Sequence, residues 1–375
     1  RDDVESRGLG DVYKRQVRSI FMDSQGGMWV GTYFGGLNYY HPLKSCFQNI
    51  RYMSERNSLN DNVITCIIED KQKGLWIGTN SGGVNHYDKH TNTFTHYTQK
   101  DGLRSNDIKA IYIDEIKNLV YIGTHAGGLS ILHRHSKHIE TYNSNIKHAY
   151  SIVPASNGDL WISTLDSIVR FNPHKKTFTT YATDQDKKPI KTNHITTIFR
   201  DSEQRLWFCG EKGISTYIET DNELKSIPLL PEGSSANHNF INSIYESHNG
   251  LFWISTRSGL YRFDINKKEF KQYTTANGLP NNIVHGVLED SYGELWISTN
   301  KGLSRFQPQT EKIKNYTDND GLQGNQFTNN SFCHTENGEM YFGGINGITT
   351  FHPDQLIDNP YTCLLYTSDA ADDLI

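Results

Sequence analysis

The chain has 375 residues, of which 35% are hydrophobic and 12% aromatic, and it carries a formal charge of −5. This balance gives no basic surface of the kind that nucleic acids attract, so a nucleic-acid partner is excluded. No apolar run approaches the roughly 18 residues of a membrane-spanning helix. We therefore expect membrane attachment only through segments beyond this sequence.

The two ends of the chain differ from everything between them. Residues 1–16 and 363–375 lack the periodicity of the remaining sequence, and both resemble translated adapter sequence at the ends of assembled fragments. We therefore exclude both ends from the fold prediction. The true N-terminus is then missing, so the lack of a signal peptide carries no information about location.

The first repeat introduces a motif, MWVGT, that recurs along the chain. An aromatic residue occupies its second position in eight repeats spaced 40–47 residues apart. These residues are Trp29, Trp76, Tyr121, Trp161, Trp207, Trp253, Trp296 and Tyr341. All six tryptophans of the protein therefore stand at this one position, and a strand-rich repeat of this length is typical of a β-propeller blade.

The second repeat indicates what one blade contains. Strand-like runs at 63–70, 75–80, 83–88 and 94–98 are separated by turn residues, and helical periodicity is absent. The fold class predicted from these runs is all-β, a propeller of four-stranded blades. Eight repeats fit a seven-bladed propeller plus one extra N-terminal blade, and a closed eight-bladed ring is the alternative.

Small residues recur at two positions of each repeat. One column precedes the aromatic residue by ten positions, or by eleven in the third repeat, and comprises Ser19, Cys66, Ala110, Ser151, Thr197, Ser243, Gly286 and Ser331. A second column, two residues after the aromatic one, comprises Gly31, Gly78, Gly123, Ser163, Cys209, Ser255, Ser298 and Gly343. First strands crowd around a central axis, so we predict that the first column lies on the innermost strand.

The Gly-rich segment 78–83, GTNSGG, could be a phosphate loop or a turn. It recurs as GTYFGG, GTHAGG and STRSGL, leads into a strand, and is not followed by a Lys-Ser/Thr pair. Phosphate loops normally occur once and lead into a helix. The segment is therefore predicted to be the turn between the second and third strands of a blade.

The repeats resemble those of the two-component regulator propeller family. The likeness rests on DGL-x-SN-x-I segments at 101–108, 277–283 and 320–327 and on the eight G-x-(L/I)-W-I-G-T motifs, and it covers about 17–362. Residues 143–168 depart from the repeat because they lack the usual Gly-Gly pair. The resemblance implies the extracytoplasmic sensor region of a hybrid two-component system that responds to glycans.

This resemblance also implies a domain organisation and a location. Residues 17–56 would be the terminal blade of a preceding propeller, and residues 57–362 would form a seven-bladed propeller. The parent protein would be a homodimeric histidine kinase of the inner membrane, with this region in the periplasm. The fragment itself would be no enzyme and would need no cofactor.

Candidate chemical groups in the sequence have plain structural interpretations. Cys66 and Cys209 occupy the small-residue columns, which favours buried free thiols over catalytic ones. His133, His135 and His138 could begin a zinc site, but an exposed hairpin accounts for them, and we predict no metal. The acids that end first strands, Asp23, Asp70, Asp114, Asp201 and Asp290, repeat with the blades, which favours turn capping over catalysis.

Topology predicts where a ligand would bind. The loops between blades and the turns between second and third strands should emerge on one face, where variable residues are free to bind hydroxyl-rich ligands. The candidates are Arg257, Glu211, His125, Arg104, Asn106, His238, Asn282 and Gln326. For any single one of these residues, an ordinary solvated rim is the favoured interpretation.

Three function classes remain. The first is a sensor of a glycan-derived oligosaccharide, the second a propeller enzyme such as a polysaccharide lyase or glycosidase, and the third a protein-interaction scaffold. An isolated carboxylate pair or Tyr–His pair would favour the enzyme. The sequence reveals neither, so we predict no catalytic residue and favour the sensor.

Overall fold

The computed structural model describes residues 16–356 except 25, 34–35, 41–46, 55, 143–145, 166, 184–194, 212, 219–222 and 228–239. The chain divides into two compact units, and the larger one runs from Phe47 to Asp354. Apart from Gln16, the two adapter-like ends lie outside the described residues. In the part of the chain that is described, no helix is long and apolar enough to cross a membrane.

The smaller unit contains one three-stranded antiparallel sheet, β1 (Val17–Met22), β2 (Met28–Thr32) and β3 (Leu37–Tyr40). Its strand order and its small-residue pair, Ser19 opposite Gly31, are those of a propeller blade. That this sheet ends a preceding propeller stays a prediction.

The larger unit contains seven four-stranded antiparallel sheets, which we number blades 1 to 7. Blade 1 consists of β5 (Ile64–Glu69), β6 (Leu75–Thr79), β7 (Val84–Asp88) and β8 (Thr93–Tyr97). Blade 2 consists of β9 (Ile108–Asp114), β10 (Leu119–Thr124), β11 (Gly128–His133) and β12 (His138–Thr141). Blade 3 consists of β13 (Ser151–Pro154), β14 (Leu160–Ser163), β15 (Ser167–Asn172) and β16 (Thr177–Thr183).

The remaining blades follow the same order. Blade 4 consists of β17 (Ile195–Arg200), β18 (Leu206–Gly210), β19 (Gly213–Ile218) and β20 (Glu223–Ile227). Blade 5 consists of β21 (Ile241–Glu246), β22 (Phe252–Thr256), β23 (Gly259–Asp264) and β24 (Glu269–Tyr273). Blade 6 consists of β25 (Val284–Glu289), β26 (Leu295–Thr299), β27 (Gly302–Gln307) and β28 (Lys312–Tyr316). Blade 7 consists of β29 (Phe327–His334), β30 (Met340–Gly344), β31 (Gly347–Phe351) and β4 (Gln48–Ile50).

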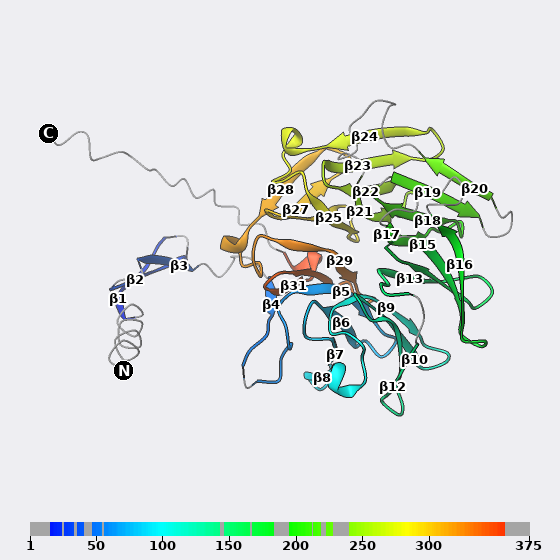
Figure 1. The fold of residues 1–375 in the computed structure, drawn as a ribbon. Helices are drawn as coiled ribbons and strands as arrows, with labels where there is room; N and C mark the ends of the chain where they lie inside the picture. The colour runs from blue at the N-terminus through cyan, green and yellow to red at the C-terminus, as the bar shows by residue number, and fades with distance from the viewer. Residues whose placement is uncertain are drawn as a thin grey trace. The chain divides into compact units, whose positions relative to one another are not determined.

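The first strands surround the centre of the ring and the fourth strands lie at its periphery (Figure 1). The ring closes where Thr328 in β29 donates a hydrogen bond of 2.6 Å to the Ile64 carbonyl in β5. The predicted all-β propeller is confirmed, and the ring closes with seven blades rather than eight.

Strand β4 corrects the predicted domain boundary. It precedes the expected division between residues 56 and 57, yet it pairs with β31 and completes blade 7. The boundary between the two units lies instead between Cys46 and Phe47. A three-residue outer strand carries none of the repeated motif, so the sequence pattern could not assign it to the distant blade.

The two small-residue columns are partners across neighbouring strands. Cys66 lies opposite Gly78 in blade 1, and Ser243 lies opposite Ser255 in blade 5. A Cβ atom added to Gly78 would lie 2.5 Å from the Cys66 sulfur, so a larger pair would not fit. The predicted placement of the first column on the innermost strand is confirmed.

The acid at the end of a first strand binds the indole of the same blade. Asp70 accepts a 2.8 Å bond from the Gly74 amide with one oxygen and a 2.9 Å bond from the Trp76 Nε1–H with the other. The same indole–carboxylate bond joins Trp29 to Asp23 at 3.0 Å, Trp207 to Asp201 at 2.7 Å and Trp296 to Asp290 at 3.0 Å. The predicted turn capping is thus confirmed, and one carboxylate fixes both the turn and the tryptophan.

The Gly-rich motif is a turn, as predicted. Thr79 donates a 2.8 Å side-chain bond to the Gly83 carbonyl across the turn. Gly83 has a φ of 80°, and a Cβ atom there would lie 2.2 Å from the Tyr97 carbonyl oxygen. Both the left-handed backbone and the close approach require glycine at this position.

We predict that the indole–carboxylate bond adds to the stability gained by burying the ring. Trp207 bonds to Asp201, whereas the blade of Trp253 has Ser247 in place of the aspartate. Trp207→Phe should lower the free energy of unfolding by about 1–3 kcal/mol more than Trp253→Phe, because only the first leaves a buried carboxylate short of a donor. Chemical denaturation measures this difference. Equal losses in both variants would contradict it.

Ser243→Leu tests the inner column. Ser243 is 2% exposed, and the added side chain should lower the free energy of unfolding by about 1–3 kcal/mol or more through overpacking. Thr179→Leu, at an exposed position of outer strand β16, is the control and should leave stability nearly unchanged. Thermal melts that do not distinguish the two variants would refute the assignment of the inner strand.

Asp70 generates a prediction about pH. Burial acts to raise its pKa, but the bonds from Trp76 and Gly74 and contacts with His86 and Arg134 outweigh burial and lower the pKa to about 2. The ordinary value is 3.8. Because the folded-state pKa is the lower one, ionised Asp70 stabilises the fold fully above about pH 4, and this stabilisation is lost as the pH falls through about 2.

Unfolding of the wild type and of Asp70→Asn, measured across this range, tests the prediction. The difference in their free energies of unfolding should be constant above about pH 4 and should shrink towards pH 2. A difference that does not change with pH would contradict it.

Candidate functional site

Backbone hydrogen bonds bring the inter-blade loops and the turns between second and third strands together on one face. The His125 amide donates 2.8 Å to the Asp107 carbonyl in the loop that precedes the same blade. The Gly83 amide donates 2.9 Å to the Asn106 carbonyl in the loop of the next blade. The expected rim of turns and loops is therefore formed as topology predicted.

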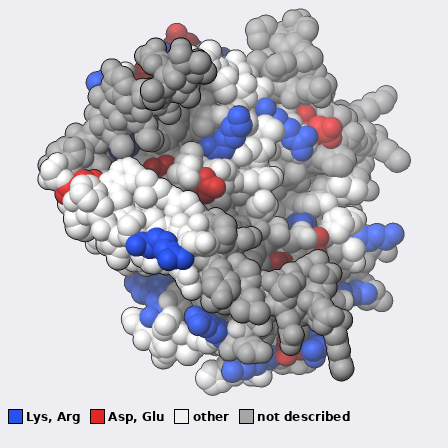
Figure 2. Space-filling view, turned by 90° about the vertical axis from the view of Figure 1, so that its left-hand side faces the viewer, with Lys and Arg blue, Asp and Glu red and all other residues white. Residues whose placement is uncertain are grey.

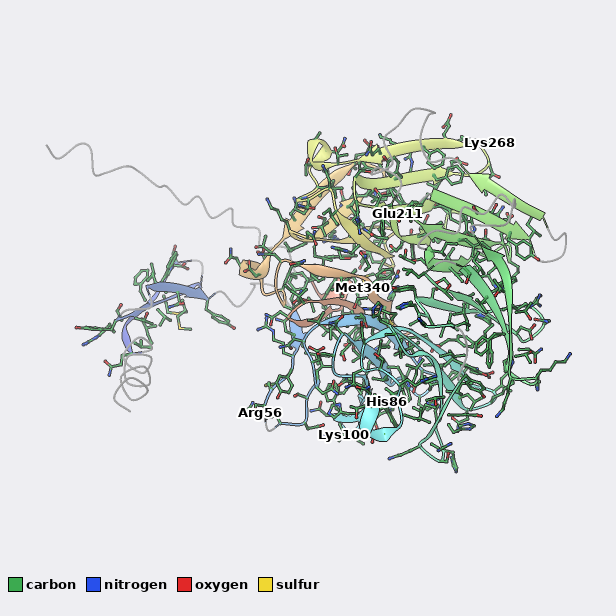
Figure 3. The ribbon with its side chains drawn as sticks, in the orientation of Figure 1. Arg56, His86, Lys100, Glu211, Lys268 and Met340 are labelled. Atoms are coloured by element: carbon green, nitrogen blue, oxygen red, sulfur yellow. The ribbon has the colours of Figure 1, made fainter. Side chains whose placement is uncertain are left out.

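Three of the predicted site residues present exposed side chains on this rim. Arg257 is exposed and places its guanidinium carbon 3.7 Å from the centre of the Phe240 ring. Glu211 is exposed directly after β18 and lies nearer the centre of the ring than Lys268 (Figure 3). Gln326 is exposed as well, and its carbonyl accepts a 3.0 Å bond from the Gln323 side chain.

Three further predicted residues build the loops. The Asn106 side-chain oxygen accepts a 2.8 Å bond from the Gln99 amide at the start of the 3-10 turn η1 (Gln99–Asp101). Asn282 accepts the same bond from the Thr275 amide in blade 6's loop. Arg104 is exposed and donates a 3.1 Å bond to the Tyr142 carbonyl. His238 lies outside the described residues.

His125 is part of an aromatic cluster that the sequence did not reveal. Its ring centre lies 4.5 Å from that of His148, and the Tyr150 hydroxyl lies 3.4 Å from its Nδ1. The rings of His148 and Tyr150 are nearly parallel, at 11° and 6.0 Å. This Tyr–His contact could not be recognised in the sequence, because the two residues belong to different blades and only the folded ring brings them together.

A second group missed in the sequence lies at β-bulges. The register shifts in the first strands of six blades, between Ile64 and Cys66 in blade 1 and at the equivalent position in blades 2, 4, 5, 6 and 7. The extra residue varies, and bulges commonly re-aim a side chain near functional sites. The bulge residues are Thr65, Lys109, Thr196, Asn242, His285 and, in a longer insertion, Thr328–Asn330, with Tyr150 in the matching place of blade 3.

The sequence offered one signal for these positions. Apart from the longer insertion in blade 7, each lies between an apolar residue and the small residue of the inner column. Its own residue type varies in polarity and size from blade to blade. Lys109 lies 2.6 Å from the Asp107 carboxylate as an ion pair, with 23% of its side chain exposed. Asp107 directly follows the predicted Asn106 in the loop before β9, and Lys109 lies in β9 itself.

The structure describes the surroundings of two predicted thiols and of the histidine cluster at 133–138. Cys66 and Cys209 are buried and free, and burial raises the pKa of Cys66 to about 12. Burial likewise raises the pKa of Cys209. His133 lies 3.7 Å from Glu140, and among the described residues no group of three or more His, Cys, Asp or Glu is arranged to hold a metal ion.

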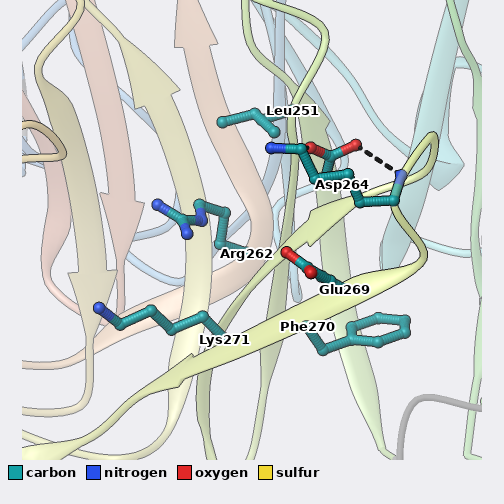
Figure 4. A pocket seen from close by; sticks show the side chains of 7 residues that line it. Leu251, Arg262, Asp264, Glu269, Phe270 and Lys271 are labelled. Carbon is teal, nitrogen blue, oxygen red and sulfur yellow. Dashed lines mark hydrogen bonds and ion pairs between the residues drawn. The ribbon is translucent and has the colours of Figure 1, made fainter.

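A cavity of about 460 Å³ lies elsewhere, on the outer strands of blade 5. Its lining includes Arg262 and Lys271 on one side and Asp264 and Glu269 on the other (Figure 4). Leu251 belongs to a turn between first and second strands, so this cavity opens towards the end opposite the rim. Its charges are mixed, and the described basic and acidic side chains are likewise interspersed on the face shown in Figure 2.

The geometry defines a seven-bladed propeller with a polar rim of turns and inter-blade loops on one face. Residues 14–34, 58–81, 235–258 and 278–301 match the two-component regulator propeller family. Four segments of the chain thus match the family that its repeats resemble.

Two relatives come from signalling proteins. Over 92% of the chain the sequence is 28% identical to histidine kinase P4 of Formosa agariphila, of whose length it spans 26%. The extracellular domain of a protein assigned to the hybrid two-component systems of B. thetaiotaomicron has a TM-score of 0.77 and 28% identity, covering 92% of this chain and 46% of that domain. The chain thus spans less than half of either relative.

An enzyme shares the fold alone. Virginiamycin B lyase from Staphylococcus aureus has a TM-score of 0.63 at 15% identity, covering 81% of this chain and 98% of that one. Such a likeness concerns the architecture and not the chemistry of the site.

Proposed function

We propose that this chain is part of the periplasmic sensor region of a hybrid two-component signalling protein and that it binds a glycan-derived oligosaccharide on the rim without cleaving it. The parent protein would be a homodimeric histidine kinase. The observation that carries the proposal is the likeness to the extracellular domain of a hybrid two-component system, which extends over 92% of the chain at a TM-score of 0.77.

The chemistry of the rim supports a hydroxyl-rich ligand. Arg257, His125 and Lys109 offer donors, Asp107 and Glu211 offer acceptors, and aromatic rings lie beside them. Sugars require many hydrogen bonds of both senses together with apolar surface for their C–H faces. The rim provides all three on one side of a rigid ring.

A polysaccharide lyase is the second candidate, and the Tyr150–His125 contact favours it. A phenol 3.4 Å from an imidazole could move a proton during elimination. Incubating the purified chain with uronate-containing polysaccharides and following the appearance of unsaturated products distinguishes the two functions. Product formation that Tyr150→Phe abolishes would replace the sensor by the enzyme.

Arg257→Ala tests the rim. The guanidinium is exposed, and its carbon lies 3.7 Å from the centre of the Phe240 ring, so its donors are positioned for a ligand. Removing it should weaken oligosaccharide binding by about 1–3 kcal/mol if the bonded partner is charged and should leave the melting temperature nearly unchanged. Isothermal titration calorimetry against a panel of neutral and acidic oligosaccharides measures the loss.

The matched control is Arg262→Ala, in the cavity of blade 5 away from the rim. It should bind the panel as the wild type does. If Arg257→Ala binds as tightly as this control, Arg257 has no place in the site.

A further inference from the structure

The bulge residues connect neighbouring blades along most of the ring but not along all of it. Four of the seven blades place a side chain at this position that hydrogen-bonds to the inner strand of the next blade. These bonds run from Thr196 to Ile241 at 3.2 Å, Asn242 to Val284 at 2.7 Å, His285 to Asn329 at 2.5 Å and Thr328 to Ile64 at 2.6 Å. Blades 4 to 7 are therefore joined in sequence, up to blade 1.

Two further contacts add to these bonds, one of them across the ring and the other within blade 6. Thr197 of blade 4 donates a 3.2 Å bond to Asn330 of blade 7, and the second nitrogen of His285 lies 2.7 Å from the Asn300 side chain. Asn242 is 1% exposed and His285 is 8% exposed. In this half the bulge side chains bind the inner strand of the next blade, and Asn242 and His285 are buried.

Blades 1, 2 and 3 differ, and they are neighbours. The Thr65 hydroxyl is buried with no hydrogen-bond partner. Lys109 pairs with Asp107 in the loop before its own strand, and Tyr150 contacts His125 in the turn of the preceding blade. Within the described residues, none of these three bulge positions binds the inner strand of the next blade. We call Thr65, Asp107, Lys109, His125, His148 and Tyr150 the open arc.

The members of the open arc lie within electrostatic reach of one another. Burial and then the carboxylate of Asp107 raise the pKa of Tyr150, so its phenol stays protonated at neutral pH and can donate. The Lys109 ammonium lies close enough to Cys66, which adjoins Thr65, to act on the pKa of its thiol, in the lowering direction. All six residues are partly or fully exposed, although the Thr65 hydroxyl itself is buried.

The arc combines the features that a sugar ring requires. The nearly parallel rings of His148 and Tyr150 offer an apolar face for pyranose C–H groups. The Asp107–Lys109 pair offers charge-assisted acceptors and donors at its edge. Because the two charges of the pair cancel, the arc suits a neutral sugar better than an anionic one.

We propose that the open arc of blades 1 to 3 is the subsite that holds one neutral sugar residue of the ligand. This inference rests on the proposed function and gives it a location and a sugar class. Arg257, in blade 5, then lies outside the subsite and meets a more distant part of the oligosaccharide.

The experiment uses the full chain and an immobilised array of neutral and uronate-containing oligosaccharides. Tyr150→Ala and Lys109→Met should each weaken binding to the neutral oligosaccharides at least about tenfold, which corresponds to about 1.4 kcal/mol. Tyr292→Ala is the matched control, because Tyr292 is 66% exposed on a turn at the opposite end of blade 6. Melting curves establish that each variant is folded, and Tyr150→Phe replaces Tyr150→Ala if the latter does not fold.

The outcomes separate the inference from the proposed function. Loss of neutral-sugar binding in the two arc variants, with binding kept in Tyr292→Ala, supports the open arc. Binding that is unchanged in the arc variants overturns the open arc as the subsite. Binding confined to uronate-containing oligosaccharides overturns the proposed sugar class. Either result leaves the proposed sensor function intact. Wild-type protein that binds no oligosaccharide on the array overturns both.

Discussion

The hydrogen bond from a buried indole to an aspartate is the interaction on which the ring depends. In blade 1 the Asp70 carboxylate accepts from Trp76 with one oxygen and from the Gly74 amide with the other. It thereby ties the turn between first and second strands to the large ring that fills the space between blades. Arg134, which lies in blade 2, donates to the same carboxylate at 2.8 Å, so the bond also joins neighbouring blades.

These bonds fix most positions of a blade and leave a few free to vary in sequence. At one end of blades 1, 4 and 6 an aspartate fixes the tryptophan, and at the other end the Thr–Gly turn is fixed by its own bonds and by the loop of the next blade. In the open arc of blades 1 to 3, the described bulge residues do not bind the inner strand of the next blade. Binding specificity can therefore reside in Lys109 and Tyr150 without weakening the ring.

The architecture could be predicted from the sequence because every blade repeats the same packing and turn requirements. The tryptophan position, the small-residue columns and the Thr–Gly turn were all recognisable from spacing, and the structure places them as expected. Two features escaped because they depend on contacts between distant segments. Strand β4 pairs with β31 some 300 residues away, as its Asn49 bond to Thr349 illustrates, and the Tyr150–His125 contact joins two blades. Asn106 and Asn282 looked available for ligands, but their side-chain oxygens hold the loops.

The exchange of the indole N–H protons with solvent deuterium tests the central role of the Trp–Asp bond most directly. Nuclear magnetic resonance resolves each indole proton once single Trp→Phe variants have assigned it. We expect Trp76, Trp207 and Trp296, each bonded to a buried aspartate, to exchange only when the ring opens globally, and Trp253 to exchange faster through local opening. Rapid exchange of all four, or equal protection of Trp253, would contradict the account.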